Sequence, residues 1–257
     1  MNKARISIVT VCFNAADTIE KTIMSVINQT YDNIEYIIID GASTDGTVEI
    51  IKKYESQISL WVSEPDKGIY DAMNKAVLKV HGDYYFFLNC GDVFYTDTVL
   101  SNISDYLLLP NTIYYGNVIQ FPNIVRYDGA FSKWKLSVNN ICHQSIFYPN
   151  SVFCKYNYNT GYRLYADWDL NLRCFGDDDF SFKYIDQIIS VYDINGVSSS
   201  YYDPPFWHDY FRIVRSNLGL IYAVFAYIVA QYVRSKRFLY NYGVLVFYES
   251  VSNGDLI

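Results

Sequence analysis

The chain has 257 residues, of which 51% are hydrophobic and 18% aromatic, and it carries a formal net charge of −7. This length can bury a substantial core and suits one large α/β domain with an appendage better than two equal domains. The acidic balance argues against a nucleic-acid partner, yet a divalent cation and backbone donors would still let the protein hold an anionic nucleotide. Five scattered cysteines without a CxxC pair indicate reduced thiols in a cytosolic protein and argue against a structural zinc site.

Apolar strands and amphipathic helices alternate through the first hundred residues. Asp17 and Glu20 have the spacing of a capping box at the start of the first helix. We interpret the apolar start of the chain as a strand and not as a signal peptide, because polar residues interrupt it and no small-residue cleavage site follows. Strands are expected at 6–13, 34–39, 60–63 and 84–88, and helices at 17–30, 47–54 and 69–82.

This alternation predicts a parallel sheet with right-handed crossovers, in which the loops that follow the strands gather along one edge. Four polar residues on these loops are therefore expected to converge: Asn14, Asp40, Glu64 and Asp92. The strand before Asp92 is almost continuously apolar, as in a parallel strand covered on both faces. Asp92 would project from its carboxyl end into a crevice that suits a metal ion and a phosphate.

The pattern loosens beyond residue 110, where strands are expected at 112–121, 145–148 and 182–192 and a short helix at 168–175. The segment 216–233 is almost free of charge and lies between Arg215 and the basic residues Arg234, Lys236 and Arg237. It falls at the lower margin of the roughly 17 to 25 residues that span a bilayer. Two interpretations stay open: an in-plane helix on anionic lipid, or a helix buried against the domain or a partner subunit. We divide the chain into a main domain, 1–203, and a helical extension, 204–257.

Four motifs follow one another in the first half of the chain: TVCFN at 10–14, DGASTDGT at 40–47, EPDKGIYDAMN at 64–74 and LNCGD at 88–92. None is specific alone, but in this order and spacing they resemble the inverting GT-A glycosyltransferases of glycosyltransferase family 2. HQSIFYP at 143–149, YADWDL at 165–170 and GVSS at 196–199 are similar to the members that build bacterial surface polysaccharides such as colanic acid, O-antigen and capsule.

The resemblance implies a GT-A fold, which is an α/β fold with a Rossmann-like, mostly parallel central sheet flanked by helices. Residues 1–110 would form the nucleotide-sugar-binding half and residues 111–203 the acceptor-binding half. The implied enzyme moves a sugar from a nucleotide-sugar donor, expected to be a UDP-sugar, to a hydroxyl of a lipid-linked oligosaccharide. It would work in the cytoplasm, bound peripherally to the inner membrane through the helical extension, and a homodimer is left open.

On the donor side, Asp40 would accept a hydrogen bond from the imide N–H of a uracil-like base, whereas its simpler role is to cap the following turn. Asp45 fits a helix N-cap equally well, and Asp66 and Lys67 fit a solvated turn. The resemblance assigns ten residues to the nucleotide and donor sugar: Thr10, Phe13, Asn14, Asp40, Asp45, Asp66, Lys67, Asn74, Asn89 and Gly91.

Asp92 is the expected ligand of Mg²⁺ or Mn²⁺, which would neutralise charge on the departing diphosphate. Many relatives carry Asp-x-Asp here, whereas this chain has Asn89 and Cys90 upstream and Gly91 adjacent. Further ligands must therefore come from the diphosphate, from water or from a histidine, with His143 and His208 as the candidates.

Asp167 is the expected base, which would remove the acceptor hydroxyl proton as that oxygen attacks the anomeric carbon opposite the leaving phosphate. Relatives commonly show Glu-Asp where this chain has Ala166-Asp167. Asp167 is also placed to be the N-cap of the next helix, and both roles can coexist. His143, Gln144 and Trp168 are expected to face the acceptor, although each also fits a packing or pairing role. The serines at 198–200 would close over the diphosphate or form a plain linker.

Two other classes of protein compete with this interpretation. A dinucleotide-dependent oxidoreductase would carry Gly-x-Gly-x-x-Gly after its first strand, but residues 12–16, CFNAA, contain no glycine. A catalytically silent nucleotide-sugar- or glycan-binding protein stays open because the metal motif is altered.

Overall fold

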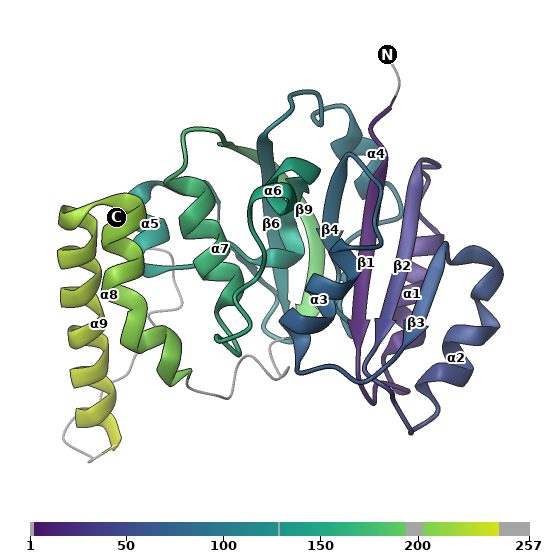
Figure 1. Cartoon of the computed structure of the whole chain (residues 1–257), viewed down its shortest axis with the longest axis horizontal. Coiled ribbons are helices and arrows are strands. Elements are labelled where there is room, and N and C mark those ends of the chain that lie inside the picture. Colours follow the sequence, from purple (N-terminus) through teal and green to yellow (C-terminus); the bar gives the residue numbers. More distant parts are fainter. Residues whose placement is uncertain (1–2, 128, 194–202, 242–257) are drawn as a thin grey trace.

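A parallel sheet with helices on both faces forms one side of the molecule, and a pair of long helices closes the other side (Figure 1). The structure is a computed structural model that describes residues 3–127, 129–193 and 203–241, with side chains described as far as residue 233. The glycine and serines at 196–200 lie outside the described residues.

The first half of the chain builds four parallel strands in the order β3-β2-β1-β4, which confirms the predicted alternation. The strands are β1 (Ile6–Cys12), β2 (Ile34–Asp40), β3 (Leu60–Ser63) and β4 (Tyr84–Phe87). The connections are α1 (Ile19–Ile27), α2 (Thr47–Lys53), the 3-10 turn η1 (Glu55–Gln57) and α3 (Ile69–Val77). Strands β1 and β4 are buried along their whole length, as expected of apolar strands covered on both faces.

Two helix ends differ from the prediction. Helix α1 begins after Thr18 and has no side-chain cap, so the predicted capping box does not form, and Glu20 instead accepts a hydrogen bond from the Tyr54 hydroxyl. Helix α3 ends at Val77 and not at Gly82. Gly82 lies in the turn before β4, where a Cβ atom would come within 2.8 Å of the Ser7 backbone nitrogen. Position 82 therefore requires glycine because the two backbones approach closely, and not because a helix ends there.

The second half of the chain extends the same sheet in the order β4-β8-β6-β9-β5, with β7 paired to β6. The predicted strands here are confirmed, whereas the short β5 and β7 were not expected. Strand β8 runs antiparallel to β4 and β6, while β6 and β9 are parallel, so the sheet as a whole is mixed. The strands are β5 (Val93–Phe94), β6 (Thr112–Phe121), β7 (Val125–Tyr127), β8 (Ile146–Pro149) and β9 (Ser181–Asp193).

The remaining elements of the domain are short helices that cover the sheet: α4 (Val99–Ser104), α5 (Lys133–Val138), the 3-10 turn η2 (His143–Ser145), α6 (Asn150–Lys155) and α7 (Ala166–Phe175). Alternate residues of β2 point to opposite faces, so Ile37 and Ile39 join one apolar core and Tyr36 and Ile38 the other. The first core also contains residues of α3 and α7, and the second contains residues of α1 and α4.

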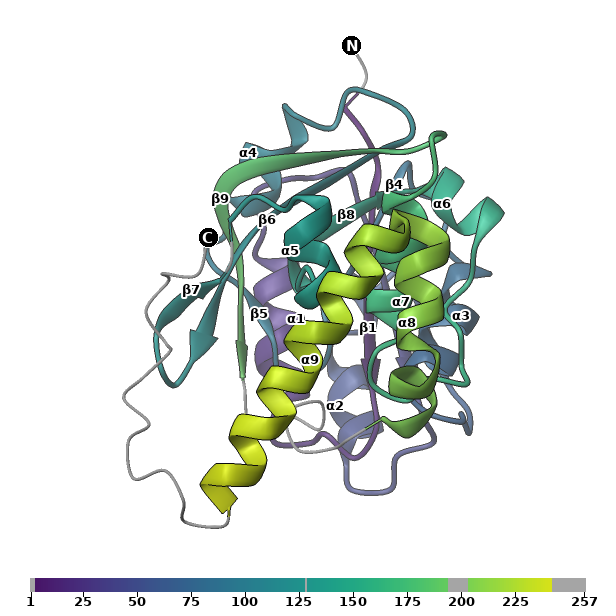
Figure 2. The ribbon, with the colours of Figure 1, turned by 90° about the vertical axis from the view of Figure 1, so that its left-hand side faces the viewer.

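The uncharged C-terminal segment is not one helix, because α8 (Pro204–Leu218) and α9 (Leu220–Asn241) are separated at Gly219, whose φ is 108°. Helix α9 buries Ala223 and Ala226 and packs on α5 and α8, while Ile221 and Ile228 are exposed. Figure 2 shows α9 crossing the outside of the domain. Packing against the domain is therefore confirmed for the buried side of α9, and binding to a membrane stays a prediction. Of the described helices, none has the length and apolar character needed to cross a bilayer.

Candidate active site

The loops that follow β1, β2, β3 and β4 meet at one edge of the sheet, as predicted (Figure 1, bottom). In the strand register Cys12 lies opposite Asp40, and Asp40 lies opposite Ser63. Backbone hydrogen bonds extend this pairing into the loops, from Glu64 N to Asp40 O at 2.9 Å and from Cys90 N to Val11 O at 3.3 Å. The polar residues at the four strand ends are thereby fixed relative to one another.

Asp40 is fully buried at the end of β2. Its Oδ1 accepts from Ser43 Oγ at 2.5 Å, and its Oδ2 accepts from Ser43 N at 2.9 Å and from Ser63 Oγ at 2.6 Å. Burial and the nearby Asp40 raise the pKa of the Cys12 thiol, which remains protonated and also faces Oδ1 at 3.5 Å. The turn-capping role of Asp40 is thus confirmed, and its contact with a nucleotide base stays a prediction.

The DGASTDGT loop is hydrogen-bonded to the loop that follows β1. Asn14 Oδ1 accepts from Thr44 N at 3.0 Å, and Asp45 accepts from Ala16 N at 3.0 Å. Asp45 also accepts from Thr47 Oγ1 at 2.6 Å, and these donors lower the pKa of its carboxyl, with the Thr47 hydroxyl as the largest cause. Gly46 occupies the N-cap position of α2, so Asp45 lies one residue before the predicted cap. The two motifs therefore act as one interlocked unit.

An exposed aromatic ring lies beside this unit. The Phe13 side chain is 62% exposed, which leaves a ring face open to a planar base. A Cβ atom on Gly41 would lie 2.6 Å from Asp66 Oδ2 and 3.2 Å from Phe13 Cδ2, so the absence of a side chain at Gly41 lets both groups approach. Phe13, Gly41 and Asp66 are thus brought together from three of the four motifs.

Other residues predicted to bind the donor have structural partners. Thr10 is buried and its hydroxyl lies 3.2 Å from the Tyr36 hydroxyl. Asn74 donates to Tyr158 O at 2.9 Å and accepts from Tyr158 N at 3.0 Å, which explains a polar residue on an apolar helix, and its contact with the donor stays a prediction. Lys67 is exposed, and Gly91, with φ of 100°, donates its N–H to Thr22 Oγ1 at 3.0 Å.

Asp167 lies in the first turn of α7 and is 6% exposed. Its Oδ1 accepts from Trp168 N at 2.8 Å and lies 2.9 Å from the Tyr70 hydroxyl, which also lies 2.8 Å from the main-chain oxygen of Leu164. Its Oδ2 lies 3.2 Å from His143 Nδ1. The N-cap position is Tyr165, so the predicted capping role of Asp167 is wrong. Burial and Asp167 raise the pKa of Tyr70 well above its usual range, so the phenol stays a neutral donor.

Tyr70 was missed by sequence reasoning. The signal was a hydroxyl-bearing residue on the buried face of α3, near Met73 and two residues after Gly68. A buried tyrosine hydroxyl usually finds a partner, but the sequence does not say that this partner is 97 residues away.

Asp92 is also 6% exposed, and its Oδ2 accepts from Gln144 Nε2 at 2.8 Å. Gln144 is itself anchored, because its Oε1 accepts from Cys142 Sγ at 2.8 Å and its main-chain oxygen accepts from Ser190 Oγ at 2.6 Å. The adjacent residues His143 and Gln144 therefore contact the two carboxylates expected to act in catalysis, Asp167 and Asp92. The turn η2 brings these predicted residues into one site.

The residues around Asp92 fit a divalent ion only in part. Within residues 3–127, 129–193 and 203–241, no group of three or more His, Cys, Asp or Glu side chains is arranged to hold a metal. Asp92 offers a carboxylate, and Asn89 Oδ1 in the same loop is buried without a hydrogen-bond partner. Such oxygens suit Mg²⁺ or Mn²⁺, which would take further ligands from phosphates and water. Both ring nitrogens of His143 have protein partners, and His208 is exposed on α8, so a histidine ligand stays a prediction.

Trp168 does not offer a ring face to an acceptor. It is 5% exposed, its Nε1 donates to Leu136 O at 2.8 Å, and its ring stacks on Phe206 with centroids 5.5 Å apart. The packing role is the one that the structure shows.

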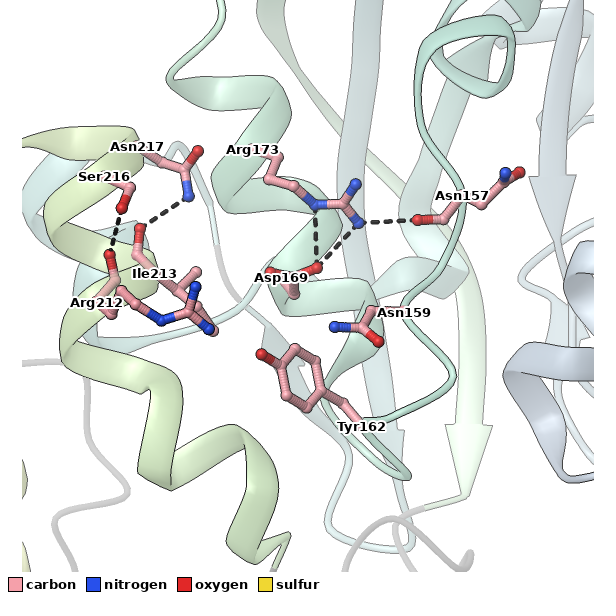
Figure 3. A pocket seen from close by; sticks show the side chains of 9 residues that line it. All are labelled: Asn157, Asn159, Tyr162, Asp169, Arg173, Arg212, Ile213, Ser216 and Asn217. Carbon is pink, nitrogen blue, oxygen red and sulfur yellow. Dashed lines mark hydrogen bonds and ion pairs between the residues drawn. The ribbon is translucent and has the colours of Figure 1, made fainter.

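The opposite face of α7 borders a separate polar cavity of about 460 Å³ (Figure 3). Asp169 lies there and pairs with Arg173, with Nε 3.0 Å from Oδ2, while burial raises the pKa of Asp169. Because Asp167 and Asp169 are two residues apart in one helix, they face different surroundings. Of the two, Asp167 is the one beside His143.

Solved structures with the same architecture identify the fold. Staphylococcus aureus TarS 1–349 in complex with UDP-GlcNAc matches 83% of this chain and 66% of its own with a TM-score of 0.66 at 13% identity. The chain spans 39% of the longer TarS structure. The mannosyltransferase PcManGT from Pyrobaculum calidifontis, in complex with GDP-Man and Mn²⁺, matches 96% of this chain and 82% of its own with a TM-score of 0.64 at 15% identity. The fold is therefore that of the GT-A glycosyltransferases.

Sequence comparison gives the family. The model of "Glycosyl transferase family 2" matches residues 7–170, and the chain belongs to this family of glycosyltransferases. It is 32% identical over 208 residues to the "PGL/p-HBAD biosynthesis glycosyltransferase" of Mycobacterium bovis, covering 78% of this chain and 81% of that protein. It is 39% identical over 93 residues to the "Putative teichuronic acid biosynthesis glycosyltransferase TuaG" of Bacillus subtilis, covering 35% and 37% of the two chains.

Proposed function

We propose that this glycosyltransferase is an inverting enzyme that moves one sugar from a UDP-sugar to a hydroxyl of a lipid-linked saccharide during synthesis of a surface polysaccharide. One observation carries the proposal: η2 holds the buried carboxylates of Asp167 and Asp92 through adjacent side chains, at the edge where the four motif loops meet. The names of the relatives, in glycolipid and teichuronic acid biosynthesis, and the UDP-GlcNAc complex of TarS support the choice of acceptor and donor class.

In the proposed reaction an acceptor oxygen attacks the anomeric carbon while the bond from that carbon to the phosphate oxygen breaks. The acceptor proton goes to the Asp167 carboxylate, and the electron pair of the broken bond stays on the departing UDP. Tyr70 and the Trp168 N–H hold Asp167 in place. A divalent ion held by Asp92 would neutralise charge on the leaving diphosphate.

On the donor side, we assign the nucleotide to residues 1–110 and the acceptor to residues 111–203. The exposed Phe13 ring would stack on the base, with Asp40, Asp66 and the interlocked loops of Asn14 and Asp45 around it. Base stacking on an aromatic side chain is worth about 1–3 kcal/mol in nucleic-acid binders, which is enough to orient a nucleotide.

The test is thermal stabilisation and nucleotide release with a panel of UDP-sugars, with GDP-mannose as the matched control and Mn²⁺ present. A ligand at 100 times its Kd stabilises a protein by about 2.7 kcal/mol, so UDP-sugars should raise the melting temperature and GDP-mannose should not. UDP release from one donor should follow. Stabilisation without release under any acceptor mixture would favour the catalytically silent binding protein, and no stabilisation by any UDP-sugar would contradict the proposal.

We also propose that the enzyme works in the cytoplasm with the outer face of α9 bound to the inner membrane. This face exposes Leu220, Ile221, Val224, Phe225, Ile228 and Tyr232, spaced as one side of a helix. Arg215 is exposed beside it, and basic residues follow at 234–237 in the sequence. An apolar face with basic flanks is typical of a helix that lies in the plane of an anionic bilayer.

Flotation with phosphatidylglycerol-containing vesicles tests this surface. The double variant Ile221→Glu, Ile228→Glu should lower the bound fraction by about tenfold or more, because it places two charges in the apolar face. Leu78→Glu, at the residue that follows α3 and where the native leucine is 84% exposed, is the matched control and should bind as the native protein does. Sedimentation in parallel detects a homodimer: if the double variant only converts a dimer to a monomer, the membrane assignment is wrong.

A further inference from the structure

His143 has a partner on each ring nitrogen inside the candidate active site. Its Nδ1 lies 3.2 Å from Asp167 Oδ2 and its Nε2 lies 2.7 Å from Asn89 Nδ2, while its side chain is 15% exposed. Asn89 follows β4, His143 begins η2 and Asp167 begins α7, so three separate segments meet at this ring. A ring held on both sides and largely buried has little freedom to turn toward a ligand.

These contacts decide which nitrogen carries the proton. The Asn89 Nδ2 group can only donate, so Nε2 must present its lone pair, and a neutral ring then carries its proton on Nδ1. That proton points at the Asp167 carboxylate, which accepts it. The opposite tautomer would place a lone pair against the carboxylate and a second donor against Asn89 Nδ2. With the Asn89 amide in this orientation, a neutral ring gives each contact one donor and one acceptor only in the Nδ1–H form.

The two oxygens of Asp167 are held differently. Oδ1 accepts from Trp168 N and faces the Tyr70 hydroxyl, whose single proton is shared with the main-chain oxygen of Leu164, whereas among the described residues His143 is the single donor to Oδ2. A carboxylate oxygen has two lone-pair sites. Oδ2 therefore keeps one site for a proton, and the direction of that site is set by the His143 hydrogen bond.

We propose that His143 is a positioning residue that orients the Asp167 carboxylate through Nδ1–H, with Asn89 fixing the tautomer, so that Oδ2 is the oxygen that receives the acceptor proton. This inference rests on the proposed function and replaces direct acceptor contact as the role of His143. Gln144, the next residue, holds Asp92 at the same time, so η2 fixes the base relative to the leaving-group side.

Two substitutions separate the roles of the two ring nitrogens. In His143→Asn the amide nitrogen can take the place of Nδ1 and still donate to Asp167, whereas in His143→Gln the amide lies near the place of Nε2 and the Asp167 contact is lost. We expect kcat for UDP release to fall least in His143→Asn, because the contact with Asp167 is kept. It should fall by about 10²-fold in His143→Gln and His143→Ala, as for a misplaced catalytic group. KM for the UDP-sugar and the Kd of UDP by calorimetry should not change.

Three kinetic outcomes overturn the proposal. Native kcat in His143→Gln with loss in His143→Asn would show that Nε2 is the working nitrogen. Equal loss in all three variants with UDP binding intact would show that the imidazole itself is needed. Native kcat in all three would show that Asp167 needs no such partner.

Nitrogen-15 NMR of the histidine rings tests the contact in the native protein and without reference to catalysis. The chain has three histidines, so His143 is assigned by the signal lost in His143→Asn. We expect a neutral Nδ1–H ring, although neutral imidazole in water favours Nε2–H. A ring without a proton on Nδ1 would overturn the inference. If no UDP-sugar is turned over, the proposed function fails, but this spectrum still decides how His143 contacts Asp167.

Discussion

Asp40 and Asp167 are buried carboxylates at the same edge of the sheet, yet their partners differ in origin. The groups that face Asp40 come from the loop after it and from the two neighbouring strands, namely Ser43, Ser63 and Cys12. Those that face Asp167 come from α3, from η2 and from its own helix. The first carboxylate builds a loop locally. The second joins three segments that are distant in sequence, and it keeps one oxygen with a single donor.

The largest difference between the two carboxylates is expected when Asp167 is made neutral. Asp167→Asn should lower kcat by about 10²- to 10⁴-fold, the usual contribution of a general base, and leave the Kd of UDP unchanged. A UDP-release assay measures kcat, and calorimetry measures the Kd of UDP. Asp169→Asn, two residues along the same helix and facing the polar cavity, is the control and should retain turnover; equal losses in the two variants would remove the special role of Asp167.

The second largest effect is expected at Asp92, which shares η2 with Asp167 through Gln144. Asp92→Ala should lower kcat by about 10²-fold or more, because a metal supplies several kcal/mol of charge stabilisation to the leaving group. Chelation with EDTA should have the same effect on the native enzyme, and added Mn²⁺ should reverse it only there. Full activity in EDTA would contradict a metal-dependent reaction.

At Asp40 we expect a loss of stability and nucleotide affinity, not of chemistry. Asp40→Asn places an amide donor against the Ser43 and Ser63 donors and should destabilise the fold by about 1–3 kcal/mol, as an unsatisfied buried group does. Urea unfolding measures this. Ser63→Ala removes a single donor and should cost less, so a larger loss in Ser63→Ala would show that Asp40 does not organise this edge.

The smallest expected effect is the acid sensitivity of the Asp45 loop. Its folded-state pKa lies below the ordinary value of 3.8, so the ionised carboxylate stabilises the fold above that pH, and the contribution is lost as pH falls through the folded value. The melting-temperature difference between the native protein and Asp45→Asn should be present at neutral pH and shrink below about pH 4. A melting-temperature difference that grows on acidification would show that the ionised Asp45 carboxylate does not stabilise the fold.

Much of the first half was predictable because its signals are local. Apolar runs at 34–39 and 84–88 and amphipathic helices between them correspond to β2, β4 and the crossovers. The predicted helix ends were less accurate. Gly82 was predicted to end α3, but this glycine serves a close contact with Ser7 on another strand. The elements β5 and β7 have two and three residues, too few to show a periodic pattern.

The sequence by itself predicted the alternation of parallel strands and helices and the edge at which Asp40, Asp92 and their loops meet, because period and motif spacing are local properties. The family resemblance added the carboxylate of Asp167 as the candidate base, whereas the order of the strands came from the structure. Only the tertiary structure decided that Asp40 is saturated, that Asn74 and Trp168 serve packing, and that Tyr70 and His143 hold Asp167. Those choices depend on hydrogen bonds between segments up to 97 residues apart, which no local pattern records.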